Sequence, residues 1–297
     1  MTPLFLGKRA GGIAFDIANY LFMALFSFSI VYPFWNMLLI SFASQTEVTS
    51  LGFRLWNKVW TAGAYGYLFS TGRIAVAYAN TIYRTVMATV LTIVVNILAA
   101  YALSKRNLPW RNWITIFFLI PMFFGGGLIP SYLLIRTLGL MDTRWALIIP
   151  GLAGSFNIII MRNFLMAMDR ELEEAAFIDG AGYATVLLRV VAPLSKPIVA
   201  TVALWTAVGH WNSWFDAMIY IRDEGKMVLQ LLLRNMITMN QSDAQDMLLK
   251  LITQKVKIHS ASVIAAATIV TIGPIVIAYP FLQKYFVKGI MIGSLKG

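Results

Sequence analysis

Six long apolar runs recur along the chain, and each is long enough for a helix that crosses a membrane. A bilayer core about 30 Å thick requires roughly 20 apolar residues in helical form. The apolar residues are continuous and do not alternate with polar ones, which indicates helices rather than barrel strands. The runs cover residues 17–40, 77–103, 113–134, 145–166, 198–221 and 260–281. The pattern predicts an all-α integral membrane protein with six transmembrane helices in one domain, residues 1–297.

The segments between the runs are two long mixed loops, two short turns and one charged, patterned insert. In that order they are 41–76 and 222–259, 104–112 and 135–144, and 167–197. In the second long loop, Ser242 and Gln245 have the S-x-x-Q spacing of a capping box. This spacing predicts a helix that runs through about Gln254.

Proline and glycine interrupt three of the runs. The third contains Pro121 and the triplet Gly125–Gly127, the fourth contains Pro150, and the sixth contains Gly273 and Pro274. Proline in a helix frees a backbone carbonyl, which lipid cannot satisfy. These turns should therefore face protein or a wet cavity, and close helix packing through small residues is the alternative.

An even number of spans places both termini on the same side of the membrane. The Lys and Arg residues divide evenly between the two sides, so their total does not decide the orientation. Lys8 and Arg9 precede the first run, whereas Arg54 lies far beyond it, which favours a cytoplasmic N-terminus. The first run is too long for a signal peptide and lacks a convincing cleavage site, so it is interpreted as a retained anchor.

The composition excludes several classes of function. Of 297 residues, 59% are hydrophobic and 12% are charged, whereas soluble domains carry about 25% charged residues. The net charge of +11 does not indicate nucleic-acid binding, because no basic stripe is interleaved with aromatics. The basic residues lie between the apolar runs and suit anionic membrane lipid. With no Cys, disulfides, thiolate nucleophiles and Cys-ligated metals are impossible.

The insert DRELEEAAFIDGAGYATVLLRVVAPLSKP predicts a helical hairpin parallel to the membrane. Asp169 can cap a first helix, and Gly180 is placed to end it in the left-handed conformation. A second short helix, Tyr183–Val191, should stop before Pro193, and Pro197 should begin the fifth span.

The first helix of the hairpin has a shallow face of small residues. Leu172, Ala175 and Ala176 share that face at i, i+3 and i+4 spacing. Such a face can enter a groove on another protein without long side chains in the way. The alternative is an amphipathic loop that lies on the lipid headgroups.

The hairpin resembles a loop of ABC-importer permeases, read as E-A-A, three residues, G, nine residues, I, one residue, L-P. Glu174-Ala175-Ala176, Gly180, Val190 and Pro193 fall at those spacings, with Val190 in place of Ile and Ala192 in place of Leu. YALSKRNLPWRNW resembles the cytoplasmic turn of that maltose-importer-like family. FFGGGLIPSYLLIRTLGLMDTRWALIIPG and VGHWNSWFDAMIYI resemble its branch for oligosaccharides from complex polysaccharides, including uronate-rich ones such as alginate.

The resemblance implies a subunit of the cell inner membrane with a cytoplasmic hairpin and both termini cytoplasmic. It implies four kinds of partner. They are a second permease subunit, which is a different chain in this branch, two ATP-binding cassette subunits, an extracytoplasmic solute-binding protein and membrane lipid. No cofactor is expected on this chain, because it lacks a G-x-x-x-x-G-K-[ST] phosphate loop, and ATP and Mg belong to the ATPase subunits.

Three groups of contacts follow from the resemblance. The residues expected to couple to the ATPase are Glu174, Ala175, Ala176, Asp179, Gly180, Pro193 and Pro197. In the closing GSLKG, Gly293, Ser294 and Lys296 resemble a tail that reaches between ATPase subunits. The 222–259 loop is expected to contact the solute-binding protein, or merely to cover the mouth of the bundle.

A second candidate site lies in the fifth run, at His210, Trp211, Asn212, Trp214, Phe215 and Asp216. An ionised Asp in a bilayer costs roughly 2.5–3.5 kcal/mol, so Asp216 should face a partner or water. Spacing places Asn212 with Asp216 on one helix face and His210 with Trp214 on another. Aromatic rings beside hydrogen-bonding groups suit a sugar, which predicts a substrate path. Interface anchoring or bonding between helices is the alternative.

Two other classes of function fit the residues less well. An ion-coupled secondary sugar transporter, with Asp216 and His210 as a relay, would leave the hairpin unexplained. A membrane enzyme should cluster its acids at one membrane face, yet five of the thirteen acids lie in the hairpin. His259 is too distant in sequence from His210 to indicate a metal pair, so no metal site is expected.

Overall fold

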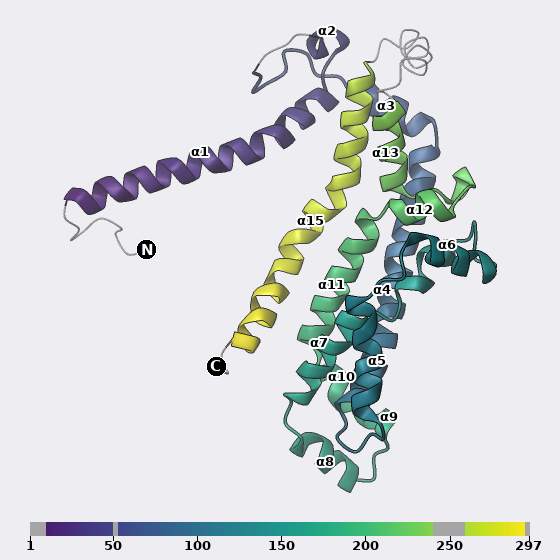
Figure 1. Cartoon of the computed structure of the whole chain (residues 1–297). Helices are drawn as coiled ribbons and strands as arrows, with labels where there is room; N and C mark the ends of the chain where they lie inside the picture. Colours follow the sequence, from purple (N-terminus) through teal and green to yellow (C-terminus); the bar gives the residue numbers. More distant parts are fainter. Residues whose placement is uncertain (1–9, 50–52, 240–258, 295–297) are drawn as a thin grey trace. The chain divides into compact units, whose positions relative to one another are not determined.

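The computed structural model describes residues 10–49, 53–239 and 259–294 (Figure 1). Within these ranges the regular elements are helices, apart from one isolated β-bridge between Ala43 and Trp60. The prediction of an all-α fold is confirmed.

The helices that Figure 1 labels vary from three residues to 35. They are α1 (Ala10–Ser41), α2 (Gln45–Val48), α3 (Gly63–Ser70), α4 (Arg73–Ser104), α5 (Arg111–Phe123), α6 (Leu128–Thr137), α7 (Ser155–Met166), α8 (Glu171–Ile178), α9 (Tyr183–Val186), α10 (Ala192–Leu194), α11 (Lys196–Asn212), α12 (Phe215–Tyr220), α13 (Leu229–Met239) and α15 (Ser260–Ser294). Short 3₁₀ turns cover Arg144–Leu147 (η1), Ile149–Gly151 (η2) and Glu224–Lys226 (η4), and Leu187–Val191 (η3) is π-helical.

Among the described residues, three single helices are long and apolar enough to cross a membrane, and three bent pairs raise the number to as many as six. The single helices are Gly12–Ser41, Arg73–Ser104 and Ser260–Ile277. The pairs are Arg111–Phe123 with Leu128–Thr137, bent by 116°, Arg144–Gly151 with Ser155–Met166, bent by 45°, and Tyr183–Leu194 with Lys196–Asn212, bent by 79°. The first bend falls at the predicted glycine triplet, where Gly127 has a φ of +82°.

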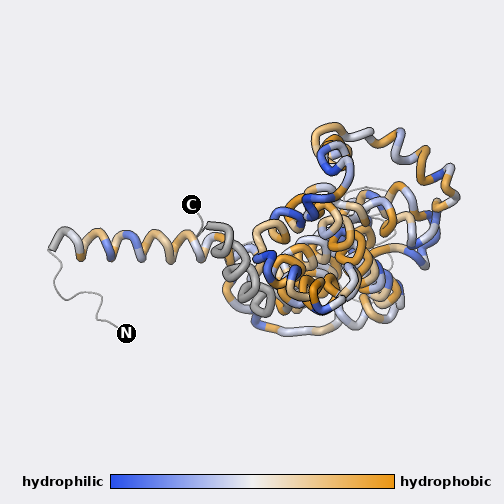
Figure 2. Tube along the Cα trace, turned by 90° about the horizontal axis from the view of Figure 1, so that it is seen from below, coloured by the Kyte–Doolittle hydropathy of each residue, from blue (hydrophilic) through white to orange (hydrophobic). Residues whose placement is uncertain are grey.

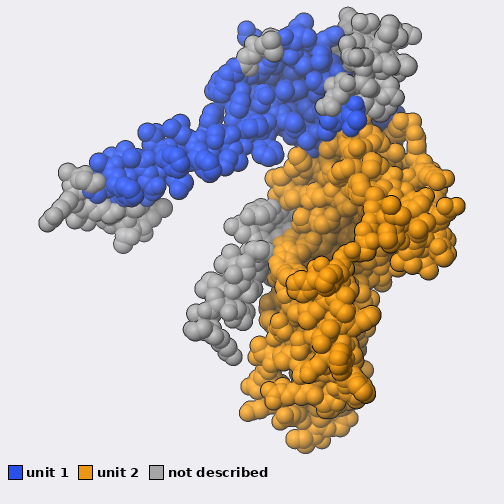
Figure 3. Space-filling view, in the orientation of Figure 1, with its two compact units in different colours: residues 1–71, 236–270 blue, residues 72–235, 271–297 orange. Residues whose placement is uncertain are grey.

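The chain forms two compact units, which are described separately (Figure 3). Unit 1 comprises residues 1–71 and 236–270, and unit 2 comprises residues 72–235 and 271–297.

In unit 1, α1 exposes apolar side chains along its length, as a helix surrounded by lipid requires. Figure 2 shows only isolated hydrophilic positions along it. At its end the chain folds back: Asn57 Nδ2 donates to the carbonyl of Leu39 at 2.7 Å, and the ring of Tyr32 stacks on Phe53.

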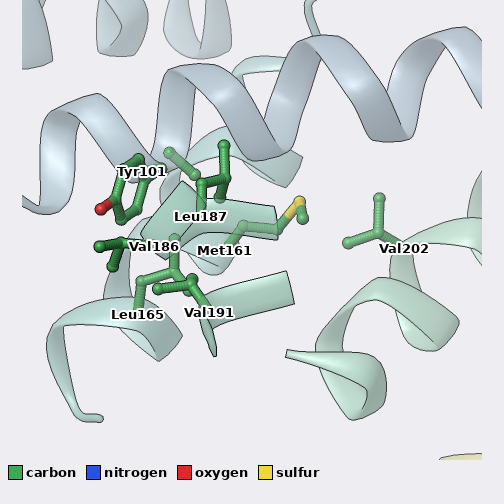
Figure 4. Close-up of a cluster of buried hydrophobic side chains, with 8 residues drawn as sticks. Tyr101, Met161, Leu165, Val186, Leu187, Val191 and Val202 are labelled. Carbon is green, nitrogen blue, oxygen red and sulfur yellow. The ribbon is translucent and has the colours of Figure 1, made fainter. Parts of the chain in front are cut away.

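In unit 2, α4 packs along both α7 and α11. Figure 4 shows the buried side chains that join them. Tyr101 comes from α4, Met161 and Leu165 from α7, and Val202 from α11. The second arm of the hairpin adds the buried residues Val186, Leu187 and Val191. This core cluster therefore ties the hairpin to three spans.

A line of polar residues runs along α4 at helical spacing: Thr85, Thr89, Thr92 and Asn96. Each has a buried side-chain atom with no hydrogen-bond partner among the residues that the structure describes. Asn96 is fully buried, and both its amide nitrogen and its amide oxygen lack partners there. Such groups cost free energy in an apolar interior, so at these four positions packing, rather than hydrogen bonds of the side chains, holds α4 against the described residues.

Candidate functional site

The hairpin begins with α8, whose C-terminus forms a complete Schellman motif. Gly180 has a φ of +83° and donates its N–H to the carbonyl of Phe177 at 3.0 Å. Ala181 donates to the carbonyl of Ala176 at 3.0 Å. These are the two bonds of that motif, and glycine adopts the required conformation without strain. The predicted left-handed turn at Gly180 is confirmed.

One face of α8 is fastened to the rest of unit 2. Ala176, Phe177 and Ala181 pack against the core cluster. Glu173 forms an ion pair with Lys105, directly after α4, and both side chains are largely buried. α8 is therefore attached both to the end of α4 and to the core cluster.

The opposite face of α8 is exposed and bears most of the residues predicted to couple to an ATPase. Glu174, Ala175, Asp179 and Gly180 are exposed, whereas Ala176 faces the core cluster rather than the outside. Ile178, which was not among the predicted residues, is 86% exposed. An apolar residue between an E-A-A motif and the glycine of the turn was the available signal.

The second arm of the hairpin differs from its prediction. A helix stopping before Pro193 was expected, but helical structure continues through η3 into α10, which contains Pro193. Proline clashes with the carbonyl four residues earlier in an α-helix, and the wider π turn displaces that carbonyl. Pro197 lies in the first turn of α11, as predicted.

The second candidate site is organised by Arg84 of α4, whose side chain is 3% exposed. Its guanidinium forms a bidentate contact with Asp216, at the start of α12. It also donates to His210 Nδ1 at 3.2 Å and to the carbonyl of Ser213 at 3.3 Å. Asp216 additionally accepts from the Ser213 hydroxyl at 2.8 Å and from the Ala217 N–H at 2.9 Å. The guanidinium thus joins α4 to both sides of the break between α11 and α12.

This break corrects the predicted helix faces. Asn212 and Asp216 were placed on one face and His210 on another, assuming a continuous helix. The helix stops at Asn212 and restarts at Phe215, and Arg84 brings His210 and Asp216 together. The contact with Arg84 supports bonding between helices for Asp216. Arg84 was missed, although a cation inside an apolar run is a functional signal in itself.

The other residues of the predicted substrate path have separate environments. Trp211 is buried and donates its indole N–H to the carbonyl of Thr271 at 3.1 Å. Trp214 lies under the guanidinium of Arg234, 4.5 Å from its ring centroid. Asn212 is exposed and accepts from Gln230 at 3.3 Å. Trp211 thus packs between helices, and Asn212 is exposed, whereas Trp214 is half-buried between Arg234 and a cluster of buried residues.

The turn before η1 is fastened to the chain that follows α12. Asp142 accepts from the N–H groups of Arg222 and Asp223, both at 3.0 Å. The Lys226 ammonium donates to the carbonyl of Asp142 at 2.8 Å and lies 3.5 Å from its carboxylate. The two backbone hydrogen bonds, and then the charge of Lys226, hold the pKa of Asp142 below its ordinary value.

Some predicted features fall outside what is described. Ser242, Gln245 and Gln254 of the predicted capped helix, and Lys296 of the tail, lie outside the described residues. Gly293 and Ser294 belong to the last turn of α15. Among the described residues, no group of three or more His, Asp or Glu side chains could hold a metal ion.

Comparison with known proteins identifies the family. Residues 93–292 match the family model described as "Binding-protein-dependent transport system inner membrane component". Protein LplC of Bacillus subtilis is 40% identical over 96% of both chains. The polygalacturonan/rhamnogalacturonan transport system permease protein YtcP of the same species is 37% identical over 95% of this chain and 98% of its own length.

A solved structure also matches this chain and belongs to an ABC transporter. A chain in the crystal structure of a bacterial ABC transporter involved in the import of the acidic polysaccharide alginate matches with a TM-score of 0.88 and 32% identity. The match covers 96% of this chain and 100% of that one.

The family decides between the classes of function that the sequence left open. Neither an ion-coupled secondary transporter nor a membrane enzyme is consistent with it. A permease of this family works with a partner permease, an ATPase carried on separate subunits and a solute-binding protein. The chain belongs to the family of binding-protein-dependent transport system inner membrane components, and it is the permease subunit of an ABC importer rather than an enzyme.

Proposed function

We propose that this permease imports oligosaccharides, with acidic, uronate-containing chains as the preferred class. The observation that carries the proposal is the similarity, over nearly the whole chain, to an importer of the acidic polysaccharide alginate. The relative YtcP, whose name specifies polygalacturonan and rhamnogalacturonan, supports the same class.

In this proposal the exposed face of α8 docks on an ATPase subunit. Glu174, Asp179 and the exposed Ile178 make the contact, and Ala175 gives clearance. Closure of the ATPase dimer moves α8, and two attachments carry the movement inward. The Lys105–Glu173 pair transmits it to α4, and the core cluster transmits it to α7 and α11. Rocking of these spans then exposes the substrate path to alternate sides of the membrane.

The proposed topology follows from the docking role. The hairpin and both termini lie in the cytoplasm, and the 222–259 loop lies outside, where it meets the solute-binding protein. Gly293, Ser294 and Lys296 reach between two ATP-binding cassette subunits, which bind ATP and Mg. The partner permease is a different chain.

For the substrate path, the geometry favours a division of roles. The Asp216 side chain is 28% exposed, and its carboxylate accepts hydrogen bonds from Arg84, Ser213 and Ala217. We assign it to holding α12 in place. Asn212 offers an exposed amide, and Trp214 offers the part of its ring that Arg234 and the core leave exposed. These groups would contact a sugar, because pyranose rings have apolar faces and hydroxyl rims.

Reconstituted transport tests the substrate class. The complete importer is placed in proteoliposomes with its solute-binding protein loaded with either uronate oligosaccharides or neutral maltodextrins of equal length. We expect ATP-dependent uptake and stimulated ATP hydrolysis with the uronate series, and vesicles without ATP serve as the control. Uptake of the neutral series alone would contradict the acidic class. Uptake of neither, with a binding protein that holds both, would contradict oligosaccharide import.

A further inference from the structure

The turn between α4 and α5 forms a hollow that the transport mechanism above does not use. Its volume is about 320 Å³, and it is lined by Arg106, Leu108, Trp110, Arg111, Asn112 and Trp113. Basic and indole side chains thus surround one concave surface. Because the turn joins two segments that qualify as membrane spans, it lies at a membrane surface.

Trp110 sits in this turn in a conformation that costs free energy. Its φ is +57°, in the left-handed region that a bulky residue rarely adopts. Its side chain is 75% exposed, and that of Trp113, one turn later, is 67% exposed. Burial within the chain therefore does not compensate for the backbone strain. A strained, exposed aromatic residue is explained by a contact made with something outside the chain.

The charges at the hollow are also uncompensated. Among the described residues, neither Arg106 nor Arg111 forms an ion pair. Arg111 and Arg162 both donate to the carbonyl of Leu103, at 2.9 Å and 3.3 Å, and Arg111 also donates to the sulfur of Met166 at 3.1 Å. Two guanidinium groups thus meet at the end of α4, and the nearby Lys105 is already paired with Glu173. An anion at the hollow would relieve this like-charge crowding.

We propose that this hollow binds the phosphate of an anionic phospholipid headgroup. Arg106 and Arg111 contact the phosphate, and Trp110 and Trp113 lie at the level where headgroups meet acyl chains. Indole rings concentrate at that interface, and basic side chains beside a span attract anionic lipid.

Lipid retention by the purified importer tests the proposal. The complex is equilibrated with equal amounts of phosphatidylglycerol and phosphatidylcholine, and bound lipids are counted by native mass spectrometry. We expect preferential retention of phosphatidylglycerol. Arg106→Gln should weaken that retention about fivefold, the effect of removing one basic side chain from an anionic surface. Arg73→Gln is the matched control, because Arg73 is exposed at the other end of α4 and paired with Glu224.

A second variant separates lipid binding from folding. Trp110→Gly removes the ring at a backbone conformation that glycine adopts freely, so the turn should remain intact while phosphatidylglycerol is lost. Equal loss in Arg73→Gln and Arg106→Gln would overturn the proposal. Displacement of the lipid by millimolar inorganic phosphate would identify a site for free phosphate instead. Loss of the ATPase subunit from the Arg106→Gln complex, with lipid unchanged, would identify a protein contact instead.

Discussion

The contact between Arg84 and Asp216 is the interaction within unit 2 whose removal should cost most. Replacing Arg84 by Met keeps an unbranched side chain in the packed site but leaves the Asp216 carboxylate with only the Ser213 hydroxyl and the Ala217 N–H. Breaking a buried ion pair by removing one partner costs about 3–5 kcal/mol. Since Asp216 is 28% exposed, we expect the lower end, about 3 kcal/mol, for Arg84→Met.

A double-mutant cycle isolates the pair from the other contacts of Arg84. Asp216→Asn keeps the shape of the side chain, removes its charge and leaves the guanidinium uncompensated. The free energy of unfolding of each variant is measured by titration with SDS in mixed micelles, followed by circular dichroism. We expect Arg84→Met together with Asp216→Asn to cost about 2 kcal/mol less than the two single changes added.

The exposed ion pair between Arg73 and Glu224 provides the control. Arg73, on the same helix as Arg84, pairs with Glu224 of η4 at 2.9 Å, but both side chains are about two-thirds exposed. Arg73→Met should therefore cost less than about 1 kcal/mol. If the costs of Arg84→Met and Asp216→Asn add within about 0.5 kcal/mol, the two residues are not energetically coupled, and the assigned role of Asp216 is wrong.

Four further predictions concern the hairpin, the turn at Asp142, the topology and the substrate path. Gly180→Val should leave the amount of permease in the membrane unchanged but abolish substrate-stimulated ATP hydrolysis, because a φ of +83° strains a β-branched residue by about 1–2 kcal/mol. Gly182→Ala, at a φ of −79°, is the control that should have no effect. Full stimulation in Gly180→Val would refute a coupling role. Because the pKa of Asp142 is lowered, its carboxylate stabilises residues 222–226 fully above the unfolded pKa of about 3.9, and this stabilisation is lost as the pH falls through the folded pKa. Hydrogen exchange of the Arg222 and Asp223 amides should accelerate as the pH falls through that value. Asp142→Asn should remove this pH dependence. With no native Cys, an impermeant thiol reagent on spheroplasts should label Asp243→Cys and spare Ser294→Cys, and the reverse would refute the proposed topology. Trp214→Ala should reduce transport while complex yield and basal ATP hydrolysis persist, whereas a parallel fall in yield would assign Trp214 to assembly.

Local signals in the sequence were enough for the membrane fold and for the turn between the two arms of the hairpin. Apolar run length alone predicts spans, because the bilayer fixes the required length. The turn at Gly180 depends only on a residue that tolerates positive φ, and the bend near Gly127 depends on adjacent glycines. Each of these features is decided by neighbouring residues, so periodicity and residue type predict it.

Features that depend on distant residues could not be read in the same way. The break at Ser213 and Trp214 contains neither Gly nor Pro, and it is maintained by Arg84, more than a hundred residues earlier. The helix likewise continues past Pro193 because a π turn precedes it, which no local propensity specifies. The exposure of Ile178 likewise depends on the opposite face of α8 packing against the core cluster, which the residues of the helix alone do not specify.

The row of unpaired polar groups along α4 has a thermodynamic consequence for the transport cycle. A span whose buried hydroxyls and amides already have partners must lose those hydrogen bonds when it moves against its neighbours. At Thr85, Thr89, Thr92 and Asn96 there is no such bond to lose among the described residues. A shift of α4 that pairs even one of these groups instead gains about 1 kcal/mol. Movement of α4 therefore breaks no hydrogen bond of these four side chains among the described residues, which lowers the cost of repacking this helix against its neighbours.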